Sequence, residues 1–243
     1  MQIRSMEIVL DTYARKARLQ PALLTALPLG LAALAWFPEG STNWSIVWGL
    51  FIWCGGATLL TQIGRDRGKR IESRLYESWG GKPTTRFLRH CDAPNKTALA
   101  RHHKKLQTLL QDIEIPTAER EHLDINRADD TYEACVAFLR EKTRDRKRFP
   151  LIFEENCNYG FRRNLLGMRA IGISVAIIGV IFTTFQIAYT YFIKGNMIHP
   201  IPVICGILSL LLLLGWIFWF TPDWVKIAAE AYAERLLASC DDL

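Results

Sequence analysis

Four long apolar stretches run through the 243-residue sequence, and none of them contains an Asp, Glu, Lys or Arg residue. They cover residues 21–37, 44–63, 170–193 and 198–220. A helix of roughly 20 apolar residues, rising ~1.5 Å per residue, crosses the hydrocarbon core of a bilayer. Only helices and closed barrels satisfy their backbone hydrogen bonds in that core. The sequence therefore predicts an all-α membrane protein with two transmembrane helical hairpins, and Pro28 predicts a kink in the first helix.

The Lys and Arg residues gather between the two predicted hairpins. Residues 64–169 contain 23 Lys and Arg against 16 Asp and Glu, a net charge of +7, while the whole chain carries +6. The positive-inside rule explains this excess if the segment is cytosolic. An anionic partner bound to the segment would explain it as well. Both explanations stay open, and residues 64–169 are expected to form a basic, mainly helical cytosolic domain.

The loops inside the two hairpins carry little charge. Glu39 is the one charged residue of 38–43, and Lys194 is the one charged residue of 194–197. This asymmetry predicts that both termini and the middle domain face the cytosol. The predicted organisation is an N-terminal amphipathic segment at 1–20, a hairpin at 21–63, the basic domain at 64–169, a hairpin at 170–220 and a C-terminal cytosolic amphipathic helix at 221–243.

Capping and periodicity signals place several helices in the basic domain. The second apolar stretch is expected to continue as a helix and to stop at Gly80 and Gly81. Residues 97–113 place leucines on one helical face. Asp130, with Glu133 three residues later, resembles a capping box and predicts the start of another helix.

A final helix is predicted after residue 221. Thr221 can cap it, Pro222 suits its first position, and Asp223 complements its dipole. The expected apolar stripe consists of Trp224, Ile227, Ala228 and Ala231. Such a helix could lie on the membrane, dock on the middle domain or join subunits.

Patterns for phosphate or calcium binding fail at their defining positions. The Gly81–Lys82 pair lacks the following Ser or Thr and the glycine five residues earlier that a Walker loop requires. Residues 124–135 begin like a calcium loop, but Asp129 stands at the glycine position and Cys135 replaces the final glutamate. Neither segment is expected to bind its ligand.

Ligands for a metal or a catalytic centre are also not grouped in the sequence. The six cysteines form no C-x-x-C pair, and the adjacent His102 and His103 point in different directions on a helix. Glu154, Glu155 and Cys157 precede an apolar stretch and are interpreted as solvated or paired with arginines. We therefore expect a protein that is not an enzyme and has no catalytic residue, metal site or cofactor.

Cations that lie away from the bilayer are candidates for binding phosphate groups, because topology alone does not explain them. These residues are Arg86, Arg89, His90, Arg101, Lys104, Lys105, Arg144, Arg146, Lys147 and Arg148.

Polar side chains of the third apolar stretch form a second candidate set. Thr183, Gln186 and Thr190 recur at i, i+3 and i+7, so they share a helical face. Polar groups in a span face protein or water, so these three either bond to neighbouring helices or line a pore between subunits. Gly172 and Ala176 form a small-xxx-small pair, which favours close helix packing.

Three further stretches are distinctive: residues 64–72 (GRDRGKRIE), 79–90 (WGGKPTTRFLRH) and 158–164 (NYGFRRN). With the four-span layout, they resemble a group of bacterial four-helix membrane proteins that act as effectors in anti-phage defence. Within this group the chain is most similar to the membrane effectors of the Hailong system. The resemblance implies a partner nucleotidyltransferase whose product, a single-stranded DNA polymer, holds an oligomeric inner-membrane channel inactive until infection removes it.

The resulting hypothesis is a homo-oligomeric ion channel that depolarises the bacterial inner membrane during abortive infection. An anionic nucleotide or single-stranded DNA bound to the cytosolic domain would control it. The alternative is a membrane-anchored nucleic-acid-binding or scaffold protein without a pore.

Overall fold

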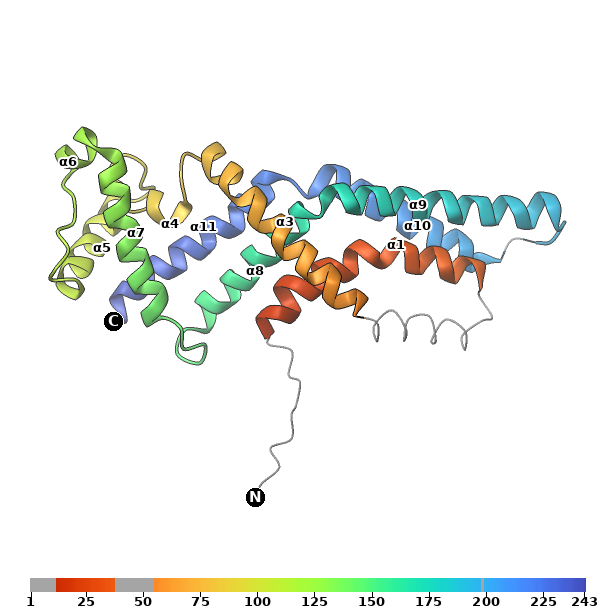
Figure 1. Cartoon of the computed structure of the whole chain (residues 1–243), viewed down its shortest axis with the longest axis horizontal. Helices are drawn as coiled ribbons and strands as arrows, with labels where there is room; N and C mark the ends of the chain where they lie inside the picture. The colour runs from red at the N-terminus through yellow and green to blue at the C-terminus, as the bar shows by residue number, and fades with distance from the viewer. Residues whose placement is uncertain (1–11, 38–54, 198) are drawn as a thin grey trace, which may run out of the picture. The chain divides into compact units, whose positions relative to one another are not determined.

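The computed structural model describes residues 12–37, 55–197 and 199–243, which form helices joined by turns, with no strand among them (Figure 1). The chain divides into two compact units. The span unit, as we call the first, comprises Met1–Ile71 and Gly160–Trp224, and the polar unit comprises Glu72–Tyr159 and Val225–Leu243. The predicted helical class is confirmed.

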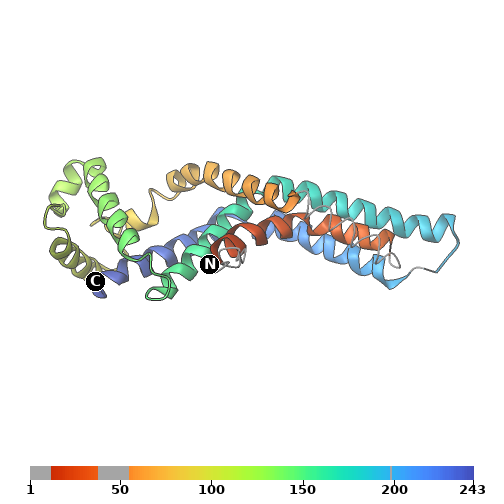
Figure 2. The same ribbon diagram turned by 60° about the horizontal axis from the view of Figure 1, so that its bottom comes forward.

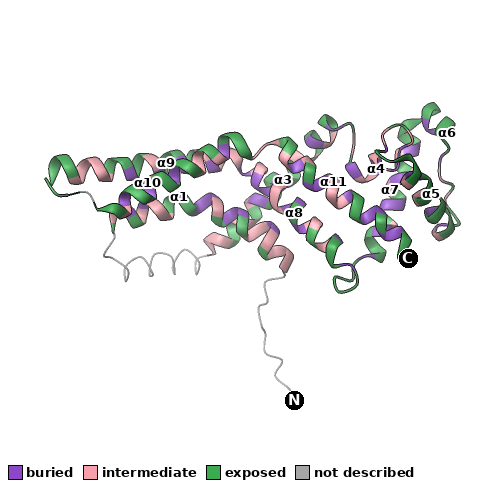
Figure 3. Ribbon diagram, turned by 180° about the vertical axis from the view of Figure 1, so that it is seen from behind, coloured by how far each residue is buried: buried purple, intermediate pink, exposed green. Residues whose placement is uncertain are grey.

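Three helices of the span unit are long and apolar enough to cross a membrane, namely Ala14–Trp36, Arg169–Ile193 and Pro200–Trp219. They contain α1 (Gln20–Trp36), α9 (Arg169–Ala188) and α10 (Pro200–Leu214), each extended by a turn or more of π-helix. Large apolar side chains are exposed along α9 and α10 (Figure 3).

Three of the four predicted spans are thus confirmed as helices of membrane-spanning length. Most of the second predicted span, at 44–63, lies outside the described residues; its last part, from Gly56, opens α3 (Gly56–Ser78).

The first long helix runs without a break across residue 20, where the sequence predicted a boundary. Its opening turns, Ala14–Leu19, are wound as a π-helix, and Pro21 follows them. Proline has no N–H, so the Ala17 carbonyl lacks the donor that a residue four positions later would supply. The side-chain amide of Asn164 donates to that carbonyl at 2.7 Å. Residues 1–11 of the predicted N-terminal segment lie outside the described residues.

Small residues let the three long helices pack closely. A Cβ atom added to Gly172 would meet the ring of Trp216, and one added to Gly179 would meet Pro28 at 2.8 Å. Ala176 is fully buried on the same helix. The predicted pair of Gly172 and Ala176 therefore lies at a helix contact, as small-xxx-small pairs do in membranes.

The chain passes between the two units within helices. The unit boundaries fall inside α3, α8 (Pro150–Gly167) and α11 (Pro222–Ala238). After α3, Gly80 and Gly81 have φ angles of 78° and 132°, which side chains rarely allow, so the helix stops where the sequence predicted.

Helices from two distant parts of the sequence build the polar unit. They are α4 (Pro83–Arg86), α5 (Lys96–Leu109), α6 (Ala118–Leu123), α7 (Ile125–Lys142) and the parts of α3, α8 and α11 that lie in this unit. Leu88, Leu106, Tyr132, Leu139 and Leu236 are fully buried in one core. Because Leu236 belongs to α11, the C-terminal helix docks on the middle domain, one of the three outcomes that the sequence left open. Figure 2 shows the end of the chain beside α5.

Two helix details of the polar unit correct the sequence predictions. Helix α7 begins at Ile125, not at the capping-box pattern around Asp130, because the Asp124 side chain accepts a hydrogen bond from the Arg127 N–H at 3.0 Å. In α11 the expected stripe residue Ile227 is 62% exposed. Leu236 points into the core, and Ile227 lies on the opposite, exposed face of the helix.

Candidate functional site

Arg89 is an internal, paired residue of the polar unit. Its guanidinium donates to the two carboxylate oxygens of Asp129 at 2.8 and 2.6 Å. It also donates to Asp92 and to the Gly80 carbonyl, both at 2.8 Å. The bonds with Asp129, followed by those with Asp92, raise the pKa of Arg89 against the opposing effect of burial. Arg89 therefore holds the turn after α3 to α7, and a phosphate would have to displace two carboxylates to reach it.

His90 is also held in place from inside. The buried carboxylate of Glu121 accepts hydrogen bonds from the His90 N–H at 2.7 Å, the Cys91 N–H at 3.1 Å and the Tyr132 hydroxyl at 2.7 Å. Burial acts to raise the pKa of Glu121, but these hydrogen bonds outweigh it and lower the pKa. Glu121 matches no motif, and its role follows only from the loop that it organises.

Arg86 completes this internal set. Its guanidinium lies 3.7 Å from Asp92 and 3.9 Å from Glu230, a residue of α11. The predicted ligand-binding residues Arg86, Arg89 and His90 are thus brought together, but by contacts that stabilise the polar unit.

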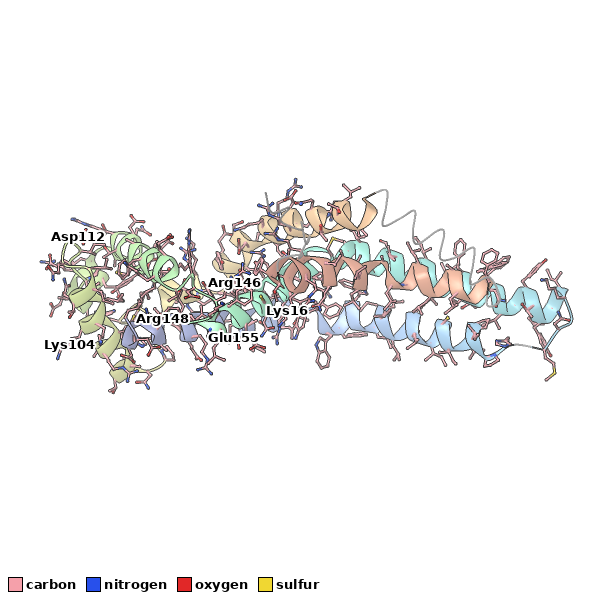
Figure 4. The ribbon with its side chains drawn as sticks, turned by 90° about the horizontal axis from the view of Figure 1, so that it is seen from below. Lys16, Lys104, Asp112, Arg146, Arg148 and Glu155 are labelled. Carbon is pink, nitrogen blue, oxygen red and sulfur yellow. The ribbon has the colours of Figure 1, made fainter. Side chains whose placement is uncertain are left out.

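The other predicted cations lie on the surface of the polar unit, on α5 and in the 144–148 loop (Figure 4). Arg101 of α5 pairs with Asp241 at 3.1 Å. Arg148 donates to the backbone carbonyl of Asp242 at 2.7 Å. The Asp241–Asp242 segment is therefore the shared partner of α5 and the loop.

The remaining cations of this surface differ in their partners. Arg144 lies 2.9 Å from Glu141, and Arg146 stands over the ring of Phe153 at 4.5 Å. Lys104, Lys105 and Lys147 are exposed, and within the described residues their ammonium groups have no ion pair. These three lysines, which we call the surface lysines, are the predicted cations that can meet an anion without breaking an existing contact.

Net charge divides unevenly between the units. The span unit contains 12 Lys and Arg against 5 Asp and Glu, a net charge of +7. The polar unit contains 18 Lys and Arg against 19 Asp and Glu, a net charge of −1. The basic character predicted for 64–169 is therefore that of its two ends, which belong to the span unit, and Asp241 and Asp242 near the C-terminus add negative charge to the polar unit.

Those two ends meet the start of the first long helix at a close contact, which we call the helix junction. A Cβ atom on Gly68 of α3 would overlap the Asn164 side chain of α8. One on Gly167 would lie 2.5 Å from the Gly68 nitrogen, and one on Gly160 would lie 3.0 Å from the Ala17 side chain. Glycines at these positions let three backbones approach. This contact was not predicted from the sequence, although its signal is present there. Gly64 and Gly68 lie on one face of α3, and Gly160 and Gly167 lie on one face of α8.

Three arginines near the junction bind within the span unit. Arg169 donates to the carbonyls of Trp216 and Ile217 at 3.0 and 2.7 Å, at the end of the helix that contains α10. Arg162 donates to the Trp224 carbonyl at 2.8 Å and stands over its ring. Arg163 is buried and donates to the side-chain oxygen of Asn164. These cations stabilise the ends of the helices.

The predicted pore residues separate into two environments. Thr183 is fully buried and donates to the carbonyls of Gly179 and Val180 at 2.9 and 3.0 Å. Gln186 donates to the Thr190 hydroxyl at 3.2 Å, and both side chains are half-buried. The shared face is therefore present for Gln186 and Thr190, whereas Thr183 points into the bundle of its own chain.

Across residues 12–37, 55–197 and 199–243, no group of three or more His, Cys, Asp or Glu side chains is placed to hold a metal ion. The five cysteines in these ranges form no disulfide bond. No protein-family model, curated protein or solved structure matches the chain.

Proposed function

We propose that the chain is a homo-oligomeric membrane effector of bacterial anti-phage defence. In this proposal it forms an ion channel that depolarises the inner membrane, with the polar unit in the cytosol. A partner nucleotidyltransferase supplies an anionic nucleotide or single-stranded DNA ligand that controls the channel. The sequence resemblance supplies the biological setting.

The observation that carries the proposal is the path of the chain between its two units. The polar unit is compact, and the chain crosses the boundary between the two units at three places, each of them inside a helix, namely α3, α8 and α11. A ligand that favours one arrangement of the polar unit can therefore bias the spans. A simple tether would need only one connection.

The surface lysines and the residues bound to Asp241 and Asp242 are the proposed ligand site. An anionic ligand would bind Lys104, Lys105 and Lys147 directly. It would also compete with the Asp241 carboxylate for Arg101. The net charge of the whole unit is −1, so binding would depend on this surface and would weaken with salt.

Fluorescence anisotropy with a short labelled single-stranded oligonucleotide tests the ligand site in the full-length protein. The double variant Lys104→Glu/Lys147→Glu should weaken binding on the order of tenfold at low salt. The control Arg74→Glu/Arg140→Glu makes the same charge change at exposed residues of the same unit. Equal weakening by the two variants would show that the oligonucleotide responds to net charge and has no site at the surface lysines.

A membrane-anchored binding protein without a pore is the second candidate, and the burial of Thr183 favours it. Conductance in planar bilayers separates the two candidates. A channel lined by the half-buried pair should lose conductance on Gln186→Leu with Thr190→Val, while the internal variant Thr183→Val should leave it unchanged. A protein that binds the oligonucleotide but never conducts would be the anchored binder.

A further inference from the structure

We propose that the outward side of the helix junction binds the phosphate headgroups of anionic phospholipids. The proposal concerns the span unit and does not require that the protein be a channel. Its occupant is a lipid of the surrounding bilayer.

The junction lies at one end of the three long apolar helices. The first of them begins at Ala14, and α9 begins at Arg169. Arg169 donates to the carbonyls of Trp216 and Ile217, so the end of the third helix lies at the same level. Headgroups of a bilayer crossed by these helices would lie at this level.

The opposite end of the three helices has a different character. The ring of Trp36 lies 5.9 Å from that of Phe185 and 6.1 Å from that of Tyr189. Lys194 is the one cation that follows these aromatic residues in the chain before α10. In the described part of the span unit this end therefore has one cation, whereas the other ten Lys and Arg residues lie towards the junction end, beside a second aromatic cluster that includes Trp216 and Trp224.

The glycine contact explains why the cations of α3 point outward. Gly64 and Gly68 form the buried side of this part of the helix, and at Gly68 α8 approaches too closely for a side chain. The positions around them, Arg65, Arg67 and Arg70, are all exposed. Within the described residues none of these three guanidinium groups has an ion pair or a side-chain hydrogen bond, whereas Arg162, Arg163 and Arg169 donate hydrogen bonds to oxygen atoms of the span unit.

Cations of the first helix add to this surface. Arg15 is exposed and Lys16 is half-buried, and Figure 4 shows Lys16 at the beginning of that helix. Asn164 bonds to the Ala17 carbonyl, which fixes this turn at the junction. Asp66 and Asp223 are the acidic residues in the described part of the span unit, against eleven Lys and Arg. The surface therefore has a large uncompensated positive charge.

An exposed apolar residue that precedes the arginines on α3 identifies the occupant as a lipid. Leu59, two turns before the first of these arginines on α3, is 64% exposed. A headgroup phosphate on the arginines would place acyl chains against such side chains, whereas a soluble anion would leave them uncovered. Clusters of Lys and Arg next to a span attract anionic lipids in this way.

Native mass spectrometry of the full-length protein tests this inference. The protein is purified in detergent with equal amounts of phosphatidylglycerol and phosphatidylcholine that have the same acyl chains. The wild type should retain mostly phosphatidylglycerol. The variant Arg65→Gln/Arg67→Gln/Arg70→Gln should lower the ratio of the two retained lipids on the order of tenfold.

Three controls keep the result interpretable. Arg74→Gln/Lys104→Gln/Arg140→Gln removes three exposed cations from the polar unit and should leave the ratio unchanged. Replacement of Arg65, Arg67 and Arg70 by Lys should keep the enrichment, which excludes a failure to fold as the cause. Inorganic phosphate at matched ionic strength should not displace the lipid.

Three outcomes would overturn the inference. One is equal retention of both lipids by the wild type, and another is equal loss of enrichment in the two Gln variants. The third is complete displacement by inorganic phosphate, which would mark a general anion site and not a lipid site.

Discussion

The two units are both helical, but their helix contacts differ, although the span unit also buries the large residues Leu165, Met168 and Trp216. The span unit packs through small residues such as Ala17, Gly172 and Ala176, and it exposes large ones such as Ile181 and Phe218. The polar unit packs through Leu88, Leu106, Tyr132 and other large residues. Within lipid, burying apolar area gives no advantage, so close backbone contact decides the packing. In water, removal of large apolar side chains from solvent is the main stabilising term.

The largest expected loss of stability comes from breaking the buried ion pairs of the polar unit. Arg89→Met leaves Asp129 and Asp92 without their common partner and should cost roughly 3–5 kcal/mol of unfolding free energy. Chemical unfolding followed by circular dichroism measures it. Arg144→Met, which breaks an exposed pair with Glu141, should cost about 0–1 kcal/mol. Similar costs for the two variants would show that Arg89 is not an internal anchor.

The next effect concerns the span unit and its glycine contacts. A methyl group at Gly167 would lie 2.5 Å from the Gly68 nitrogen and 2.7 Å from the Arg67 carbonyl carbon, both backbone atoms that cannot move independently. Gly167→Ala should therefore cost about 1–3 kcal/mol of stability, measured by thermal unfolding in detergent.

Gly215 provides the matched control for that substitution, because nothing lies within 4 Å of its added Cβ atom. Gly215→Ala should be neutral or stabilise by roughly 0.5–1 kcal/mol, since alanine favours a helix. An unchanged unfolding temperature for Gly167→Ala would contradict the close backbone contact at the junction.

A smaller effect should appear as the polar unit is acidified. Burial, which includes stacking of the ring on Tyr132, lowers the pKa of His103 below its ordinary value of 6.5 and outweighs the hydrogen bond between its Nε2 and the Leu88 carbonyl oxygen, 2.8 Å apart, which acts to raise the pKa. The folded state then binds fewer protons than the unfolded chain, so stability should fall as pH drops through 6.5. Denaturant midpoints measured between pH 8 and pH 5 should show this slope.

Glu121 should add a second loss at lower pH. Its folded pKa is lowered from an ordinary value of 4.5, so its contribution is present above 4.5 and is lost as pH falls through the folded pKa. His103→Gln should flatten the loss near pH 6 and leave the loss below 4.5 in place. A loss near pH 6 that His103→Gln leaves unchanged would contradict the assignment to His103, and no further loss below pH 4.5 would contradict the assignment to Glu121.

Several features were predicted correctly because each of them depends on a single pattern that is local in the sequence. The uncharged stretches gave three helices of membrane-spanning length, and Gly80 and Gly81 stopped α3. The start of α7 was predicted wrongly because both Asp124 and Asp130 can cap a helix in sequence. The structure shows that Asp124 is the cap and that Glu133 instead binds Lys82 at 2.6 Å.

The candidate site was harder to predict, since it depends on distant partners. Arg89 and Asp129 are separated by 40 residues, so their pairing left no local signal. The charge of the middle domain depends on where the compact units divide. The net charge of residues 64–169 is +7, but seven of its Lys and Arg residues lie in 64–71 and 160–169, which belong to the span unit.

The most direct test of the proposed function is ion leak from liposomes that contain the purified full-length protein. We expect a leak that a short single-stranded oligonucleotide suppresses at low salt, and that returns after the oligonucleotide is digested. Absence of leak with and without the oligonucleotide, from protein shown to be inserted in the bilayer, would contradict the channel and leave the anchored binding protein.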